Sequence, residues 1–170
     1  MVSFTKTQPI TLHIVIAEDE AFQRATIHET VNRALLLLKT KDGIEIRAVV
    51  YECENGQLAL EKIKELRSHG HRVSLLLTDY EMPEMDGFSL VNNTAIKHDK
   101  NCQVIMISAI PNESAEHNKV AQLENDEALA SHFEFHGKGD GFSFRHLKEV
   151  LRASSEARLD TSPRGHSSRF

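Results

Sequence analysis

The chain has 170 residues, of which 40% are hydrophobic and 26% charged, and its formal net charge is −5. These values are typical of one globular domain with a sizeable core. Without a lysine- or arginine-rich run a nucleic-acid partner is not expected, and no apolar stretch reaches the length of a membrane span. We therefore expect a cytoplasmic protein with no membrane partner. Cys53 and Cys102 are predicted to be buried reduced thiols, with a disulfide as the alternative.

Apolar runs alternate along the chain with amphipathic segments. Runs typical of buried strands occupy residues 12–17, 44–50, 73–78, 103–108 and 132–136. Segments typical of helices occupy residues 20–39, 57–67, 86–97, 112–131 and 144–151. This alternation argues for a parallel sheet with helices on both faces. We predict an α/β fold, a doubly wound five-stranded parallel sheet with five helices.

Three local features refine this prediction. The apolar face of the first helix is expected to include Phe22, Ile27 and Val31, and Asp86 is a plausible N-cap of the third helix. Residues 1–10 are polar and form a short lead-in before the domain at 11–152. Residues 153–170 are rich in serine and arginine, which is typical of a disordered tail.

Side chains able to do chemistry follow the predicted strands. Glu18 and Asp19 follow the first strand, and Asp79 follows the third. Because the carboxyl ends of parallel strands meet at one edge of the sheet, these acids are expected to cluster there. Such a cluster is costly in free energy unless a cation lies in it. Ser108 and Lys138 follow the fourth and fifth strands, so they could join the same cluster.

The segment that begins at Asp79 continues with Met82, Pro83, Met85, Asp86 and Gly87. Together with the acid pair, the hydroxyl group and the lysine, it resembles the receiver domain of two-component response regulators. The resemblance covers residues 11–152 and implies the flavodoxin-like strand order 2-1-3-4-5. It also implies a phosphoprotein rather than an enzyme, with only self-catalysed phosphorylation and dephosphorylation.

The resemblance assigns roles to the clustered residues. Asp79 would accept a phosphoryl group from a sensor histidine kinase or a phosphotransfer protein, and Lys138 and Ser108 would contact the transferred group. Mg²⁺ would be bound by Asp19 and Asp79 directly, by Glu18 through water and by the backbone carbonyl of Glu81. The ion would offset the repulsion between Asp79 and an anionic phosphoryl donor.

The resemblance also implies a switch. Ser108 would move toward the phosphoryl group, and Phe135 would then change rotamer. The signal would appear on the face formed by the segments 112–131, 132–136 and 144–151, where an unknown output protein would bind. A homodimer could form through the same face. The leading interpretation is therefore a single-domain response regulator.

Two departures from the family pattern and several alternatives accompany this interpretation. Gly139 stands where the family usually has proline, and the stretch from Ser108 to Lys138 is longer than usual, which suggests a specialised partner. A phosphorylation-independent binding module and the receiver fragment of a hybrid kinase or phosphorelay protein are the alternatives. A dehalogenase-type phosphatase or a flavin carrier is disfavoured, because Glu81 stands where the former needs aspartate and Glu18 would repel the phosphate of the latter. The ten histidines are scattered outside any known metal-binding motif, so they predict no metal site.

Overall fold

The computed structural model describes residues 9–161 apart from residues 37, 42, 111–113 and 139–142. Within them the strands are β1 (Ile10–Ala17), β2 (Ile46–Cys53), β3 (Val73–Thr78), β4 (Gln103–Ser108) and β5 (Phe133–Gly137). The helices are α1 (Ala21–Leu35), α2 (Gly56–Ser68), α3 (Gly87–Asn93), α4 (Ala115–Glu124) and α5 (Phe144–Thr161), with a 3₁₀ turn, η1, at Ala95–His98. All strand pairs of the sheet are parallel, in the order β2-β1-β3-β4-β5. The predicted fold class and strand order are confirmed.

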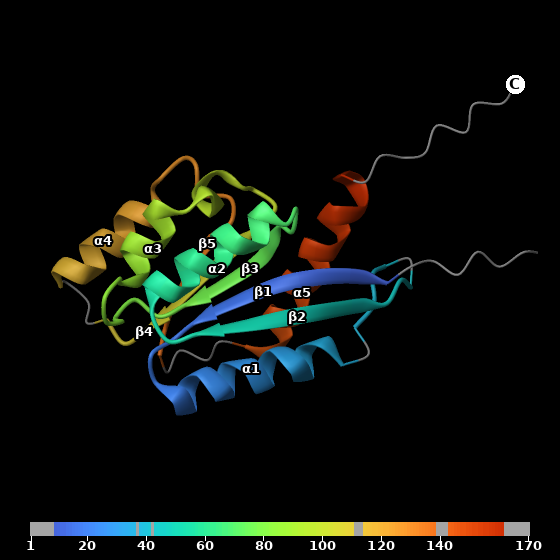
Figure 1. Cartoon of the computed structure of the whole chain (residues 1–170), viewed down its shortest axis with the longest axis horizontal. Coiled ribbons are helices and arrows are strands. Elements are labelled where there is room, and N and C mark those ends of the chain that lie inside the picture. The colour runs from blue at the N-terminus through green and yellow to red at the C-terminus, as the bar shows by residue number, and fades with distance from the viewer. Residues whose placement is uncertain (1–8, 37, 42, 111–113, 139–142, 162–170) are drawn as a thin grey trace, which may run out of the picture.

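The sheet separates two layers of helices (Figure 1). On one face, β-strand side chains such as Ile14 and Ile16 join a cluster with residues of α1 and α5. On the other face, Val15 and Ala17 join residues of α2, α3 and α4. Neighbouring residues join opposite clusters because side chains alternate between the two faces of a strand. Since helices cover both faces of the sheet, every residue of β3 is buried.

The first helix is shorter than predicted. It ends at Leu35, and Leu36 takes an extended conformation that turns the chain back toward the sheet. Leu38 is then buried in the core, and its carbonyl accepts a hydrogen bond from the Ile46 backbone N–H. Leu38 thus packs in the core outside the helix, whereas Leu36 is 71% exposed. Phe22 was expected on the buried face, but 84% of it is exposed.

The second strand is displaced toward the C-terminus relative to its predicted span. It runs from Ile46 to Cys53, and its last residues pair with the end of β1, Tyr51 with Val15 and Cys53 with Ala17. Backbone pairing with a buried central strand outweighs the unfavourable strand propensity of Glu52 in this segment. Both cysteines are free and buried, as predicted.

The third and fourth helices are also shorter than the spans predicted for them. Asp86 caps α3 as expected, accepting a hydrogen bond from the Ser89 backbone N–H, but Thr94 is extended and separates α3 from η1. Ser114 caps α4, which ends at Glu124, and the chain continues in turns up to residue 132. The carboxylate of Asp126 holds these turns by accepting from Ala128 N–H and by its ion pair with Lys97 at 2.7 Å.

The last helix is much longer than predicted. It includes residues 153–161, the first nine residues of the predicted disordered tail. Ser154 and Ser155 are buried in it, and the Arg158 guanidinium donates to the backbone carbonyls of Thr11 and Arg72. These contacts to the body of the domain stabilise a helix whose composition alone indicated disorder. Residues 162–170 lie outside the described residues, as does most of the predicted lead-in. Among the described helices, none has the length and apolar character needed to cross a membrane.

Candidate functional site

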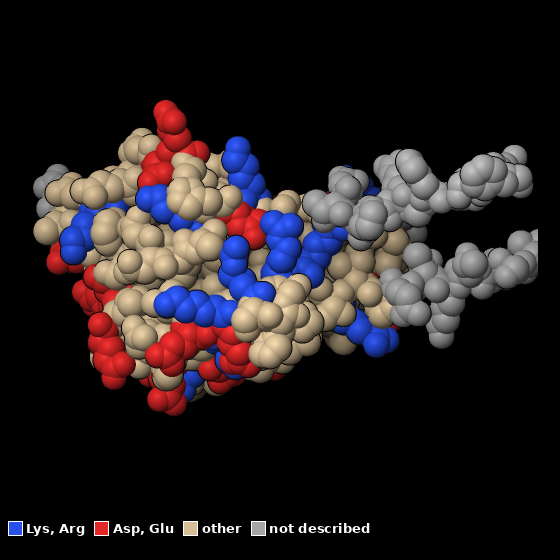
Figure 2. Space-filling model, turned by 45° about the horizontal axis from the view of Figure 1, so that its top comes forward, with Lys and Arg blue, Asp and Glu red and all other residues tan. Residues whose placement is uncertain are grey.

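The predicted site residues are held at the carboxyl edge of the sheet by backbone hydrogen bonds. Each strand ladder continues one residue past its end: Glu18 N–H donates to the Cys53 carbonyl at 3.1 Å, and Asp79 N–H donates to the Ala17 carbonyl at 2.9 Å. On the other side, Lys138 N–H donates to the Ser108 carbonyl at 2.8 Å. The register of the sheet therefore fixes where these side chains begin. Acidic side chains gather on the side of the molecule toward which the strand arrows point (Figures 1 and 2).

Four of the predicted side chains meet at this edge. Carboxylate oxygens of Glu18, Asp19 and Asp79 lie within 4.8 Å of one another. Lys138 Nζ lies 2.5 Å from Asp79 Oδ2 and 3.6 Å from Glu18 Oε2. Glu18 and Asp79 are buried, whereas Asp19 is exposed. The lysine neutralises only part of the negative charge of three neighbouring carboxylates.

The electrostatics of the cluster favour an added cation. Burial, and next the charge of Asp79, raise the pKa of Glu18. Burial alone would lower the pKa of Lys138, but its hydrogen bond to Asp79 and the charges of both buried acids outweigh this effect and raise it. Among the described residues, Glu18 Oε2 is one of the few buried side-chain oxygens without a hydrogen-bond partner. An oxygen-rich, negatively charged set with one unsatisfied buried oxygen fits a hard divalent cation such as Mg²⁺.

The loop after Asp79 is shaped closely around that residue. The Tyr80 backbone N–H donates to Asp79 Oδ1 at 2.6 Å, and the Glu81 backbone N–H points to the same oxygen at 3.4 Å. Gly87 N–H donates to the Tyr80 carbonyl at 2.8 Å. A Cβ atom at Gly87 would lie 2.2 Å from the backbone oxygen of Asp79, so only glycine permits this approach. The segment from Asp79 to Gly87 therefore folds back so that its end packs against Asp79.

A shallow hollow at the surface adjoins the acid cluster at Asp19. It is lined by Asp19, Tyr80, Glu81, Met82, Pro83, Asp86, Glu116 and Lys119. Asp19 and Glu81, two of the residues predicted to bind Mg²⁺, both belong to this lining.

The structure places the two predicted switch residues close to this site. Ser108 is buried at the end of β4 and is joined to Lys138 through the backbone. Phe135 lies on β5 opposite Met106 of β4 and packs, partly buried, against the core on the α4 side of the sheet. Gly139, the departure from the family pattern noted above, lies outside the described residues. Lys138 nevertheless forms its ion pair with Asp79, although glycine rather than proline follows it in the sequence.

Arg24 is a site residue that the sequence analysis missed. Its guanidinium donates to the backbone carbonyl of Glu18 at 2.6 Å and that of Asp19 at 3.3 Å, and pairs with Glu52 at 3.6 Å. Arg24 is itself buried and lies on the inner face of α1, three residues before Ile27. Arg24 is a charged residue at a position that the helical pattern assigns to the apolar face, and this could have identified it from the sequence. It fixes the backbone that carries the first two acids.

Comparisons with known proteins agree with this geometry. A family model described as the response regulator receiver domain matches residues 14–135. The chain is 37% identical over 102 residues to the chemotaxis protein CheY of Bacillus subtilis, covering 59% of this chain and 70% of the relative. It is 32% identical over 111 residues to protein-glutamate methylesterase/protein-glutamine glutaminase 1 of Syntrophomonas wolfei, covering 65% of this chain but only 27% of that protein.

Solved structures show the same fold. The N-terminal domain of an uncharacterized protein from Wolinella succinogenes aligns with a TM-score of 0.62 at 19% identity, covering 89% of this chain and 99% of that one. A two-component response regulator from Cytophaga hutchinsonii aligns with a TM-score of 0.60 at 15% identity, covering 86% and 98%. With a family model matched over most of the described strands and a relative covered over most of its length, the chain belongs to the response regulator receiver domain family.

Proposed function

We propose that the protein is a Mg²⁺-dependent phosphoacceptor of two-component signalling. Asp79 would take a phosphoryl group from a sensor histidine kinase or a phosphotransfer protein. The observation that carries the proposal is the position of Asp79 between two other carboxylates and the Lys138 ammonium, 2.5 Å away. Receiver domains are phosphoacceptors rather than enzymes in the usual sense and generally bind Mg²⁺ at their acidic site.

The chemistry would be a nucleophilic displacement at phosphorus. One carboxylate oxygen of Asp79 forms a bond to phosphorus, the bond between phosphorus and the donor breaks, and its electron pair leaves with the donor. The Tyr80 N–H holds the other side of the carboxylate in place through Asp79 Oδ1. Lys138 would leave Asp79 to pair with the oxygens of the transferred group, with Ser108 contacting the same group. Mg²⁺ would be held by Asp19, Asp79 and the Glu81 carbonyl, with Glu18 acting through water, and would supply positive charge that offsets repulsion of an anionic donor.

The output would pass through β5. Phe135 is partly buried beside β4 and could change rotamer when Ser108 moves toward the phosphoryl group. The face formed by α4, β5 and α5 would then bind an output protein of unknown identity, or a second copy of the chain. The turns from Asp126 to His132 lie between α4 and β5 in the long stretch from Ser108 to Lys138, and we propose that they serve a specialised partner.

A single-domain regulator is the arrangement that we propose for this output. The alignment with the CheY relative covers 70% of that protein. The methylesterase relative and a neighbour described as a response regulator/GGDEF domain protein, of which the chain covers 50%, are longer proteins. A receiver that belongs to a hybrid kinase or phosphorelay protein remains the alternative to a single-domain regulator.

Intact-mass spectrometry after incubation with acetyl phosphate and Mg²⁺ tests the proposal. We expect one phosphoryl adduct, which is absent in Asp79→Asn and absent when EDTA replaces Mg²⁺. Thermal unfolding should show that Mg²⁺ raises the melting temperature of the unphosphorylated protein, because the ion binds the folded state. No adduct with either acetyl phosphate or a phosphorylated histidine kinase domain would favour the phosphorylation-independent binding module instead.

A further inference from the structure

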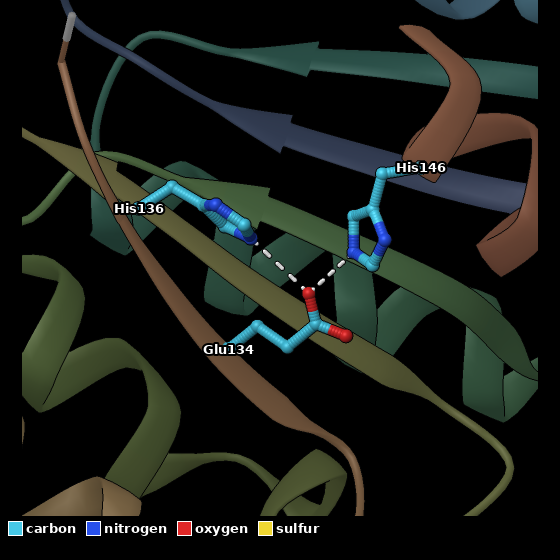
Figure 3. Close-up of side chains that lie close together, drawn as sticks. All are labelled: Glu134, His136 and His146. Atoms are coloured by element: carbon cyan, nitrogen blue, oxygen red, sulfur yellow. Dashed lines mark hydrogen bonds and ion pairs between the residues drawn. The ribbon is translucent and has the colours of Figure 1, made fainter. Parts of the chain in front are cut away.

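A second cluster of ligand-type side chains lies between β5 and α5 and shares no residue with the acidic cluster. It consists of Glu134 and His136 on β5 and His146 in the first turn of α5 (Figure 3). Residues 134 and 136 share one face of the strand because side chains alternate along it. Both histidine rings point toward the same carboxylate oxygen, and Nε2 of His136 and of His146 lie 3.1 Å and 2.6 Å from Glu134 Oε2. The three side chains are 27–35% exposed, so an ion can reach them from solvent.

The spacing of these atoms is close to that of a metal site. In a tetrahedral zinc site with bonds of roughly 2.0–2.1 Å, neighbouring ligand atoms are about 3.3 Å apart. Here the three ligand atoms lie within 4.8 Å of one another; the 3.1 Å separation between His136 and Glu134 is close to the tetrahedral value, and the 2.6 Å separation between His146 and Glu134 is shorter than it. The rings of His136 and His146 are tilted by 50° with centroids 5.6 Å apart, so they face a common point without stacking. Small side-chain movements would open room for an ion.

The chemistry of the donor set selects the kind of ion. Two imidazole nitrogens and one carboxylate suit Zn²⁺ and its late transition-metal neighbours, whereas Mg²⁺ prefers oxygen ligands alone. Burial alone would raise the pKa of Glu134, but the hydrogen bonds from His136 and His146 outweigh burial and lower it. The carboxylate is therefore ionised at neutral pH and needs to lose no proton on binding a metal.

We propose that Glu134, His136 and His146 form a Zn²⁺ site, separate from the acidic site, that joins β5 to α5. Its remaining coordination position would be open to water. The site flanks Phe135 in the sequence and lies on two of the three elements expected to form the output face. A bound ion would fix the strand of the proposed switch to the helix beside it. This site depends on none of the residues assigned to phosphorylation.

Isothermal titration of the full chain with ZnCl₂, in excess Mg²⁺ to occupy the acidic cluster, tests this proposal. We expect one Zn²⁺ per chain, with affinity at least tenfold weaker in His136→Gln and in His146→Gln. His71→Gln is the matched control, because His71 also lies beside another histidine, His13, with ring centroids 4.5 Å apart, but belongs to no cluster of three such ligands among the described residues. This variant should bind Zn²⁺ as the wild type does.

Two further measurements separate a true site from its alternatives. Co²⁺ in place of Zn²⁺ should give visible absorption bands that are lost in His146→Gln, and Asp79→Asn should keep Zn²⁺ binding unchanged. Melting temperatures without metal establish that the histidine variants are folded, as expected for side chains that are about one-third exposed. The proposal is overturned if the wild type binds no Zn²⁺ under these conditions, or if folded His136→Gln and His146→Gln bind it as tightly as the wild type.

Discussion

Replacing Gly87 by alanine should disturb the phosphoacceptor more than a single methyl group suggests. The new Cβ would lie 2.2 Å from the backbone oxygen of Asp79 and 3.1 Å from the Tyr80 Cα. These neighbours are backbone atoms held by the sheet and by the Tyr80 N–H bond to Asp79 Oδ1, so no flexible side chain can give way. Relief requires the start of α3 to move by about 1 Å relative to β3.

The cost follows from three contributions. Overpacking of this kind costs about 1–3 kcal/mol, and weakening the 2.8 Å hydrogen bond from Gly87 N–H to the Tyr80 carbonyl costs about 1 kcal/mol more. The better helix propensity of alanine offsets up to about 1 kcal/mol of this loss in the free energy of unfolding. The net loss is about 2 kcal/mol, which corresponds to a fall in melting temperature of roughly 4–8 °C for a domain of this size.

Thermal unfolding and the rate of phosphorylation by acetyl phosphate measure the two consequences. A shift of about 1 Å between the start of α3 and β3 would misplace the loop that holds the Asp79 carboxylate, and this should slow phosphorylation by about 100-fold. Gly70→Ala is the control, since Gly70 has a positive φ of 77° but open space around its Cβ position. It should lose about 1 kcal/mol through backbone strain and keep the wild-type phosphorylation rate. A Gly87→Ala protein with the melting temperature and the rate of the wild type would refute this reasoning.

Three other predictions follow from buried or paired groups. Burial raises the pKa of Cys53 to about 11, so its thiol should react with a disulfide reagent at pH 8 only as fast as the protein unfolds, and denaturant should restore rapid reaction. Arg24→Met should lower the free energy of unfolding by about 2 kcal/mol and weaken Mg²⁺ binding, because the carbonyls of Glu18 and Asp19 lose their donor; calorimetric titration with Mg²⁺ would show this, and unchanged affinity would contradict it. The folded-state pKa of Glu134 lies below its unfolded value of 4.5, so its stabilising contribution is present above that pH and is lost as the pH falls through the folded pKa. Urea unfolding should therefore find Glu134→Gln less stable than the wild type at about pH 5 but equal to it near pH 2, and a difference independent of pH would count against this pairing.

The sheet and the acidic edge could be predicted because their signals are local. Apolar runs define the strands, and parallel strands bring Glu18 and Asp79 to one edge whatever the helices do. The end of α1 could not be predicted, since Leu36 and Leu38 continue the helical pattern while the turn back to the sheet is set by a backbone bond to Ile46. The length of α5 also depends on tertiary contacts, those of Arg158 with the start of β1 among them.

The histidine cluster was hidden from the sequence for a related reason. Glu134 and His136 alternate along one strand, but His146 joins them only because α5 packs beside β5, which no local pattern specifies. Arg24 was overlooked because a cation within an apolar helical pattern is usually taken as an exception. Its role becomes clear only when the carbonyls that it binds are located.

The two ends of α5 make different contacts with the rest of the domain. Its first turn carries His146, which contacts Glu134 on β5 through a partly exposed pair. Arg158, near its other end, donates to the backbone carbonyls of Thr11 and Arg72, which lie at the amino-terminal ends of β1 and β3. Eighteen residues of helix are about 27 Å long, so the contact with β5 and the contacts of Arg158 are far apart along α5. Because Leu147, Val150 and Leu151 are buried in the core between them, a displacement of β5 that reached His146 would also disturb the packing of this helix on the sheet.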